Sequence, residues 1–312
     1  MATGFGYNGW IGFAQETTYG TYVAGAKFIE ILKESIVPER KRIMRPSLRQ
    51  ISVANSFNGK RIVKGSFSAQ FNMNGMERLI YNALGTDSTS GTNPYTHAYT
   101  CADTLPSGMS FHVNRDAANV GTGSAFKYMG CNITKMTLSQ KMEEPLEVSF
   151  DIIGQDWGVL NVETPTFPTV ATLDYSQLGT FTVGGSTFVV KDFEVSVENA
   201  LASDRYYLGS DKIRGLGRSG PRKVSGSFTK EFESLTEYNL FRNLTSSAIV
   251  ATWTSGSQSL SLSMPNCYLQ AGEPSLSDAG PIMQKFEFEA IRSSTAGDEF
   301  ALTLINTTAS GV

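Results

Sequence analysis

The 312-residue chain has few of the residues that most enzymes use for catalysis or metal binding: two histidines and three cysteines. His97 and His112 have no neighbouring His, Cys or acidic residue at metal-ligand spacing. Cys101, Cys131 and Cys267 lie far apart and form no CxxC pair, which disfavours zinc and redox chemistry. We therefore expect buried, reduced thiols, with no catalytic residue, no cofactor and no metal ion.

Long apolar runs and early basic residues are also missing. No apolar run approaches the roughly 18 residues that a membrane span needs, so we expect no membrane anchor. The first basic residue is Lys27, and Gln15 and Glu16 interrupt the early apolar residues, so we expect no secretory signal. The stretch GLGRSG at 215–220 has the letters of a dinucleotide fingerprint. A charged loop precedes it and a strand pattern follows, so we interpret its glycines as loop residues.

The dominant pattern in the chain is an alternation of apolar and polar residues with a period of two. It is clearest in VKGSFSAQFNM at 63–73, LEVSFDI at 146–152, FEVSVE at 193–198 and LSLSM at 260–264. Such alternation is typical of antiparallel strands with one buried and one solvated face. The sequence therefore predicts a mainly β protein.

Two helix signals mark an internal repeat. Short amphipathic helices are predicted after Asn74 and after Ser234, each with a Glu three residues later as a reciprocal cap. At an offset of 161 residues, GKRIVKGSFSAQF at 59–71 matches GPRKVSGSFTKEF at 220–232. We predict two tandem homologous β-sandwich domains, each flanked by one short helix. The first domain covers residues 1–161 and includes an N-terminal arm, and the second covers residues 175–312. A proline-containing linker at 162–174 joins them. The polar stretch at 85–108 is predicted to be a loop.

Two basic islands stand out in a chain of net charge −3. They cover residues 33–64 and 203–223 and fall at the same place in both repeats. Nucleic-acid binding, a solvated loop and docking on the acidic surface of a neighbouring copy are the three interpretations, and the repeat favours docking. The candidate inter-subunit residues are Arg40, Lys41, Arg42, Arg45, Arg49, Arg205, Lys212, Arg214 and Arg218.

The N-terminal stretch GWIGFAQETTYGTYVAG at 9–25 combines glycines with aromatic residues. Such a density of aromatic residues is unusual for a solvated tail. We predict an arm whose aromatic side chains contact a neighbouring copy or the sandwich of the same chain. Its contact residues are Tyr7, Trp10, Phe13, Tyr19 and Tyr22.

Four segments resemble the major tail tube proteins of long-tailed bacteriophages. They are GFAQETTYGTYVAG, FIEILKES, GSFSAQFNMNGMERLIYNALG and YTHAYTCADTLPSGMSFHV. The resemblance covers most of residues 9–155, and through the repeat it extends more weakly to 190–295. It implies a β-sandwich flanked by one helix. It also implies subunits that close into rings around a continuous inner β-barrel and stack into a hollow tube.

The resemblance also implies partners and a location. Family members with one such domain form rings of six, so a chain with two domains should form rings of three with pseudo-sixfold symmetry. It further implies contacts with a tape measure protein and with tail terminator and tip proteins. The protein would be assembled in the bacterial cytoplasm into the tail of a virion, with a non-contractile tail. DNA would pass through the lumen without specific binding.

The charge of the lumen and one alternative function also follow from the sequence. A basic lining would bind phosphates and hold the DNA, so we expect a polar or acidic bore. The alternative is another self-assembling or adhesive β protein, such as a tail-tip component, a capsid decoration protein or a carbohydrate-binding module. Electron microscopy of the purified protein distinguishes these classes.

Overall fold

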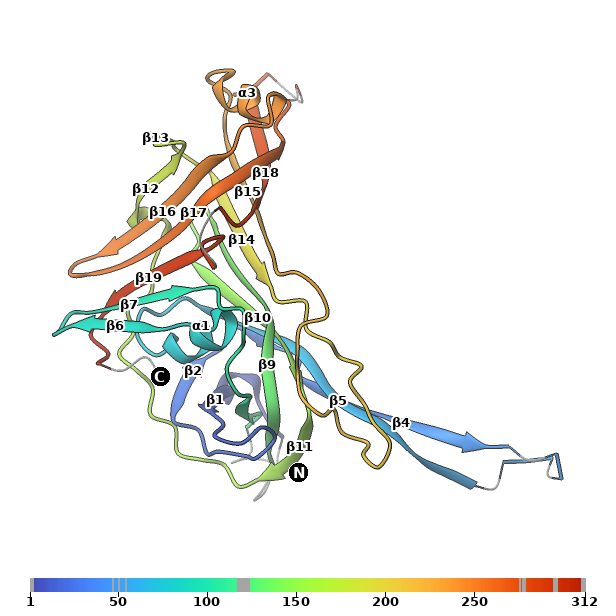
Figure 1. Cartoon of the computed structure of the whole chain (residues 1–312). Helices are drawn as coiled ribbons and strands as arrows, with labels where there is room; N and C mark the ends of the chain where they lie inside the picture. Colours follow the sequence, from blue (N-terminus) through green and yellow to red (C-terminus); the bar gives the residue numbers. More distant parts are fainter. Residues whose placement is uncertain are drawn as a thin grey trace.

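The computed structural model describes residues 3–46, 48–49, 51–53, 55–116, 124–274, 276, 279–293 and 297–309. The protein is mainly β, with 52% of its residues in strands and 7% in helices, as the alternating sequence predicts. Every described strand pair is antiparallel, and the sheet is not closed within one chain. Figure 1 shows two β layers and one long hairpin that projects from the body.

The strands of the first half run from the N-terminus to Leu160. They are β1 (Trp10–Gln15), β2 (Lys27–Glu30), β3 (Lys33–Glu34), β4 (Val37–Arg45), β5 (Asn55–Gln70), β6 (Ser88–Gly91), β7 (Tyr95–Thr100), β8 (Met109–Asn114), β9 (Ala125–Lys141), β10 (Glu147–Gly154) and β11 (Asp156–Leu160). Helix α1 (Glu77–Leu84) follows β5, and a 3-10 turn, η1 (Gly6–Asn8), precedes β1.

The second half begins with the 3-10 turn η2 (Tyr175–Gln177). Its strands are β12 (Leu178–Val183), β13 (Ser186–Thr187), β14 (Asp192–Glu198), β15 (Lys223–Glu231), β16 (Ser247–Ser255), β17 (Gln258–Ala271), β18 (Met283–Ala290) and β19 (Ala301–Asn306). Helix α3 (Thr236–Arg242) follows β15, as α1 follows β5.

One continuous sheet, here called the inner sheet, runs through both halves of the chain. Its strand order is β4–β5–β10–β9–β14–β15–β18–β17. The pairing of β9 with β14 joins the two halves without a break. The long strands β9 and β17 also pair, through their first parts, with strands of a second layer. Each half is therefore a sandwich, and the two sandwiches share one inner layer.

The apolar face of the inner sheet packs on the second layer. In the first half this layer contains β1, β2, β8 and β11, and in the second half β12, β16, β19 and β7. Phe67 and Phe150 pair across β5 and β10, and Phe228 and Phe286 pair across β15 and β18. All four rings are buried, because alternate residues of each strand point into the core.

Gly226 shows how tightly this core is packed. A Cβ at this residue would lie 2.2 Å from the carbonyl oxygen of Glu194 and 2.5 Å from the ring of Phe288. Only glycine fits there. Gly65, its counterpart in the repeat, is equally constrained, since a Cβ would lie 2.4 Å from the carbonyl oxygen of Ser35.

Both predicted helices exist, but the predicted caps are wrong. Helix α1 has Met76 at its N-cap and no side-chain cap, and α3 has Leu235 there. Glu77 does not cap its helix, because its buried carboxylate accepts a hydrogen bond of 2.7 Å from Asn306 Nδ2. Ser234 lies one residue before the N-cap of α3 and accepts a 3.3 Å bond from the amide of Thr236.

The polar stretch at 85–108 is not the loop that its composition predicts. It contains the β6–β7 hairpin, and β7 pairs with β19 from Ala301↔Thr100 to Asn306↔Tyr95. Its partner strand lies 200 residues away in the sequence, and this pairing supplies the apolar contacts that a lone polar hairpin lacks. His97 is buried on β7 and bonds to Thr89 and Asn306.

The segment predicted to be a linker, residues 162–174, packs against the first half. Leu173 is fully buried and its carbonyl oxygen accepts the amide of Leu146 at 2.7 Å. Asn72 pairs with Thr172 in an isolated bridge. The two halves repeat the same series of strand pairings, while descent from a duplication and the boundaries 1–161, 162–174 and 175–312 remain predictions.

Candidate assembly surfaces

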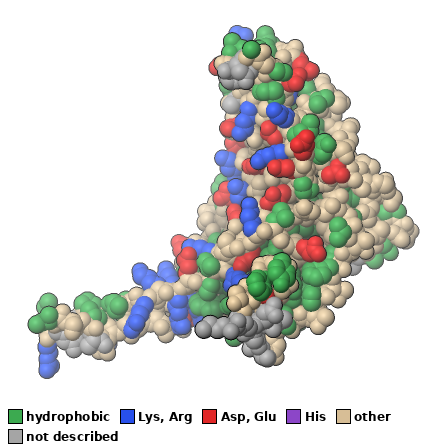
Figure 2. Space-filling view, turned by 180° about the vertical axis from the view of Figure 1, so that it is seen from behind, with side chains coloured by type: hydrophobic (Ala, Val, Ile, Leu, Met, Phe, Trp, Pro, Cys, Tyr) green, Lys and Arg blue, Asp and Glu red, His purple; other side chains and the backbone are tan. Residues whose placement is uncertain are grey.

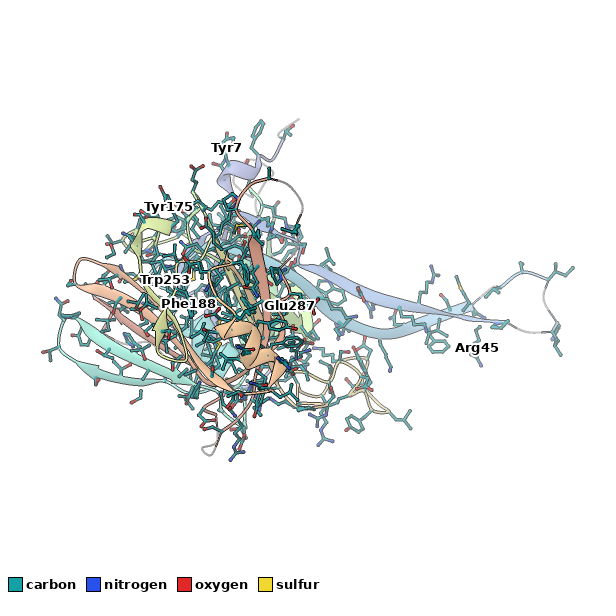
Figure 3. The ribbon with its side chains drawn as sticks, turned by 90° about the horizontal axis from the view of Figure 1, so that it is seen from above. Tyr7, Arg45, Tyr175, Phe188, Trp253 and Glu287 are labelled. Atoms are coloured by element: carbon teal, nitrogen blue, oxygen red, sulfur yellow. The ribbon has the colours of Figure 1, made fainter. Side chains whose placement is uncertain are left out.

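The first basic island forms a projecting arm rather than a loop. Strands β4 and β5 pair from Val37↔Lys64 to Arg45↔Asn55 and extend well beyond the body of the protein (Figures 1 and 3). Lysine and arginine side chains line this arm (Figure 2). The predicted residues Arg40, Lys41, Arg42 and Arg45 lie on β4 and are exposed, and Arg49 lies exposed near its tip.

The arm also exposes apolar side chains. Met44 and Phe57 are 55% and 53% exposed, and Leu48 and Ile51 at the tip are fully exposed. A two-stranded hairpin that buries so little surface is marginally stable by itself. Exposed apolar groups beside basic ones are typical of a contact surface for another protein.

A long loop from the second half holds the base of the arm. The loop at 199–222 places Asp211 3.2 Å from Arg61 Nε and 3.4 Å from Arg40 Nη2. Asp156 of β11 accepts from Arg61 at 2.9 Å and pairs with Lys212 at 2.7 Å. Lys212 and Arg40, two of the predicted interface residues, therefore already bridge the two halves of one chain.

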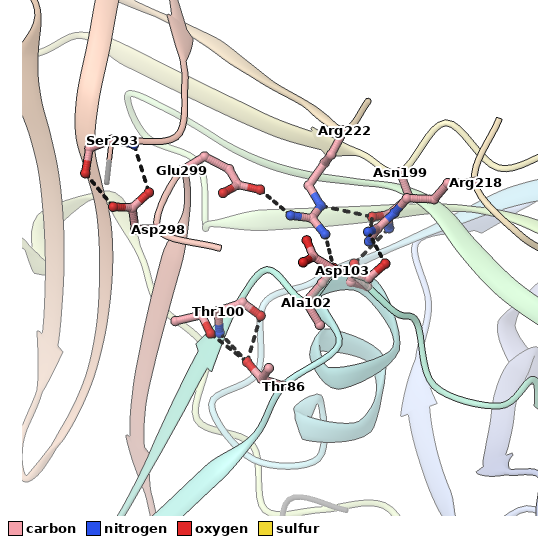
Figure 4. A network of polar contacts seen from close by, with 11 residues as sticks. Thr86, Thr100, Ala102, Asp103, Asn199, Arg218, Arg222, Ser293, Asp298 and Glu299 are labelled. Atoms are coloured by element: carbon pink, nitrogen blue, oxygen red, sulfur yellow. Dashed lines mark hydrogen bonds and ion pairs between the residues drawn. The ribbon is translucent and has the colours of Figure 1, made fainter. Parts of the chain in front are cut away.

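The rest of the second basic island is also engaged within the chain. Arg205 Nη1 donates to the carbonyl oxygen of Gly215 at 3.3 Å, and Arg214 lies 5.5 Å from the centre of the Tyr207 ring. Arg218 donates to the carbonyl oxygen of Asp103 at 2.7 Å. Its neighbours Arg222, Asn199 and Glu299 complete a network between the halves (Figure 4). The two basic islands, which lie at equivalent places in the sequence repeat, therefore differ in structure. The first lies on a projecting arm, and the second lies on a loop that packs against its own chain.

The N-terminal aromatic residues are divided between the core and the surface. Trp10 and Phe13 lie on β1 and are buried in the first sandwich, where β1 pairs with β2 and β8. Tyr22 donates a 2.8 Å hydrogen bond to Glu163, and Tyr19 is half-buried, with burial raising the pKa of its hydroxyl. Tyr7 is 81% exposed and stands at the rim of the body (Figure 3). Of the five residues, Tyr7 has the largest surface available for a neighbour.

Where β5, β10, β9, β14, β15 and β18 pair with one another, the polar face of the inner sheet carries more acidic than basic residues. Serine and threonine occupy its centre, including Ser66, Ser149 and Ser227. The carboxylates on this face are Glu147, Asp151, Asp192, Glu194, Glu198, Glu231, Glu287 and Glu289, and the bases are Lys64, Lys135, Lys141, Lys223 and Lys285. Desolvation raises the pKa of Asp151, and nearby Glu198 adds to this shift.

The two histidines and the three cysteines are buried in the described part of the chain. His112 lies 3.2 Å from Glu163 beneath Trp10, and the structure describes no cluster of metal-ligating residues. Cys101, Cys131 and Cys267 are buried free thiols, as the sequence predicts. No described helix is long and apolar enough to cross a membrane.

The family of phage tail tube proteins matches residues 6–290, which is most of the chain and includes both halves of the inner sheet. No curated protein matches the chain.

Proposed function

The chain belongs to the phage tail tube protein family, and from this premise we propose that three copies close into a ring. The rings stack into the hollow tube through which the phage delivers its DNA. As a member of this family the protein is a structural component of the virion tail. The observation that carries the proposal is the inner sheet, which is continuous through both halves and, among the described residues, has no strand partner at either of its two edges.

The width of this sheet supports three copies. Each chain contributes eight strands to the inner sheet. With strands about 4.8 Å apart and tilted by about 40°, about 24 strands close a barrel roughly 48 Å across between backbone centres. Side chains of about 5 Å on the inner wall leave about 38 Å, wide enough for hydrated duplex DNA. Two copies would leave only about 22 Å by the same estimate.

The charge of the inner sheet supports its assignment to the bore. Where β5, β10, β9, β14, β15 and β18 pair with one another, the carboxylates exceed the lysines on the polar face, and no arginine lies on that face in these pairings. Each phosphate that a protein neutralises releases counterions and tightens binding to DNA. A serine-rich and weakly acidic wall lets DNA slide.

The arm and Tyr7 then belong to contacts between copies. The arm is too exposed and too apolar to be explained as a solvated loop, and it reaches beyond the body of its own chain. We place it against the acidic surface of a neighbouring copy in the same or the next ring. Tape measure, terminator and tip proteins would bind the ends of the tube, and the tail would be non-contractile.

Electron microscopy of the purified protein tests this function. Hollow tubes with a central channel are expected after concentration at low salt. Monomers that bind a carbohydrate, or solid particles without a channel, would favour the alternative of an adhesive or decorating β protein.

A further inference from the structure

The inner sheet has two open edges in the part of the chain that the structure describes. At one edge, β3 and β4 pair only with β5, so Pro38 and Arg40 turn their backbone groups outward, while those of Ile36 are bonded within the chain. At the other edge, the last residues of β17 pair only with β18, and residues 272–274, which follow β17, have no strand partner among the described residues. Open edges of this kind pair with another strand unless they are protected.

The junction inside the chain shows how two such edges fit together. Strand β14 pairs with β9 from Asp192↔Lys141 to Glu198↔Lys135. The ladder continues one residue further, where the amide of Asn199 donates to the carbonyl oxygen of residue 134 at 2.7 Å. Odd-numbered residues of β14 therefore turn their backbone groups towards β9.

The edge at 36–40 has the same position as β14. Val63 pairs with Pro38 on one side of β5, and its repeat counterpart Val224 pairs with Val197 of β14. The segment 36–40 therefore corresponds to 195–199, so that Pro38 takes the place of Val197.

The edge at 270–274 has the same position as the end of β9. The pairing of β9 with β10 skips Thr134, and the pairing of β17 with β18 skips Gln270 at the equivalent place. Both strands carry a cysteine three residues before this bulge, Cys131 and Cys267. The segment 270–274 therefore corresponds to 134–138.

Building on the proposed function, we propose that residues 36–40 of one copy pair antiparallel with residues 270–274 of a second copy. The register is that of the β14–β9 junction. It places Arg40 opposite Gln270, Pro38 opposite Gly272, and Ile36 opposite Pro274. This ladder closes the ring by repeating between copies the joint that each chain already contains.

The first proline at this edge fits the register. Pro38 has no N–H, so the carbonyl oxygen opposite it receives no backbone donor. That carbonyl belongs to Gly272, and it already accepts a hydrogen bond from Gln284 Nε2 of its own chain. The amide of Gly272 stays available for the carbonyl oxygen of Pro38.

The second proline fits in the same way. Pro274 also lacks an N–H, and it lies opposite Ile36. The carbonyl oxygen of Ile36 accepts from Arg115 Nη2 at 2.7 Å and from the Tyr128 hydroxyl at 3.2 Å. Its amide donates to Glu34 Oε2 at 3.0 Å, so the Ile36–Pro274 pair adds no backbone hydrogen bond to the ladder. Each carbonyl that faces a proline is therefore satisfied within its own chain.

Other registers lose this match. A shift by one residue would turn the hydrogen-bonding groups of one edge away from the other. A shift by two residues in one direction would place Pro38 opposite Pro274, and neither carbonyl would face a donor. A buried carbonyl without a donor is costly in free energy, so the register that pairs Pro38 with Gly272 is favoured.

A disulfide tests this register. Val37 is 50% exposed, and the register places it opposite the exposed Glu273. Such a non-hydrogen-bonded pair has Cα atoms about 4.5 Å apart, within the range for a disulfide. The variant V37C/E273C should therefore form an intermolecular disulfide on mild oxidation. The matched control E39C/E273C is two residues out of register and should form it about tenfold less, since its Cα atoms lie beyond about 7 Å.

Denaturing gels measure the cross-link between copies, which tests the register, and electron microscopy measures tube formation, which tests the proposed function. A ladder of cross-linked V37C/E273C that ends at three chains is expected, together with tubes like those of the unmodified protein. Stronger cross-linking of E39C/E273C, or tubes with no cross-link from either pair, would overturn the register while leaving the proposed function intact. Failure of the unmodified protein to form rings or tubes would overturn the function and the junction together.

A second variant covers the case in which the double cysteine protein does not fold. V37K keeps every native cysteine, and a carbodiimide should couple the new lysine to Glu273 of a neighbour. Peptide mass spectrometry should find this link in assembled protein, and coupling of the new lysine only to other carboxylates would contradict the register.

Discussion

Replacing Lys41 and Arg45 with Glu should weaken assembly while leaving the chain folded. Both side chains are exposed on β4, and neither makes a hydrogen bond or ion pair within the described residues. Exposed substitutions without partners usually change the free energy of unfolding by less than about 0.5 kcal/mol. Arg40 is left unchanged because it pairs with Asp211 of its own chain.

The size of the effect follows from the surface position of these charges. One exposed ion pair contributes about 0.2–1 kcal/mol, and reversal replaces attraction with repulsion of similar size. Each reversal therefore costs about 0.4–2 kcal/mol, and two reversals cost about 1–4 kcal/mol at each contact between copies. Since about 1.4 kcal/mol is tenfold, the critical concentration for tubes should rise by about fivefold at the low end of this range and by several hundredfold at the high end. The arms repeat around each ring and along the tube, so the tubes should also be shorter.

Sedimentation of tubes across a salt series measures this change, with thermal unfolding as the test of the fold. The variant and the unmodified protein should converge near about 1 M salt, where the Debye length is about 3 Å. The control K141E/K285E carries the same change of charge on the polar face of the inner sheet and should assemble normally. If K41E/R45E forms tubes normally at low salt, the arm is merely solvated and its assignment to an interface is wrong.

Three further predictions concern the body of the protein. Glu237→Ala should lower the free energy of unfolding by about 3–5 kcal/mol in chemical denaturation, because it leaves the buried ammonium of Lys230, 3.4 Å away, without its buried partner. Burial raises the pKa of the Cys101 and Cys267 thiols to about 12 from 9.0. The folded protein should resist alkylation at about pH 8. It should lose roughly 1.4 kcal/mol of stability per pH unit and thiol between about pH 9 and pH 12, where only the unfolded thiols ionise. Ser227→Arg should leave tube formation intact but slow DNA delivery in a phage infection assay, since a cation in the bore binds phosphate.

Glu233 provides the matched control for Glu237. Glu233, which lies 3.8 Å from the same ammonium but is 72% exposed, should tolerate alanine with little loss of stability. Equal losses for both glutamates would show that burial does not decide the effect. Rapid alkylation of the native protein would contradict the buried thiols, and normal delivery with Ser227→Arg would contradict the assignment of this face to the bore.

The sequence predicts the class of the fold because alternation is a local property. The strands around Phe67 and Phe228 and both helices follow from patterns within about a dozen residues. The β6–β7 hairpin could not be predicted in this way, because its pairing with β19 depends on contacts 200 residues away. Glu77 fails as a cap for the same reason, since it bonds to the distant Asn306.

The candidate assembly surfaces could also be predicted only in part from the sequence. Charge density in the sequence identifies the two basic islands, but it cannot distinguish a projecting strand from a docked loop. The second island packs against the base of the arm because Asp211 on its loop forms ion pairs with Arg40 and Arg61. These contacts join the two halves of the chain and have no local signal in the sequence. The open edges at 36–40 and 270–274 carry only one signal in the sequence, which is a proline in each segment. A strand with a proline is typical of a sheet edge, although this signal does not identify the partner strand.

The number of chains in one ring tests the central claim most directly. Symmetry analysis of tube images by electron cryo-microscopy, with native mass spectrometry of isolated rings, measures it. Three chains per ring are predicted, with the two halves of each chain alternating around a pseudo-sixfold axis and the inner sheets joined into one barrel. Six chains per ring, or a lumen not lined by β5, β10, β9, β14, β15 and β18, would contradict the account.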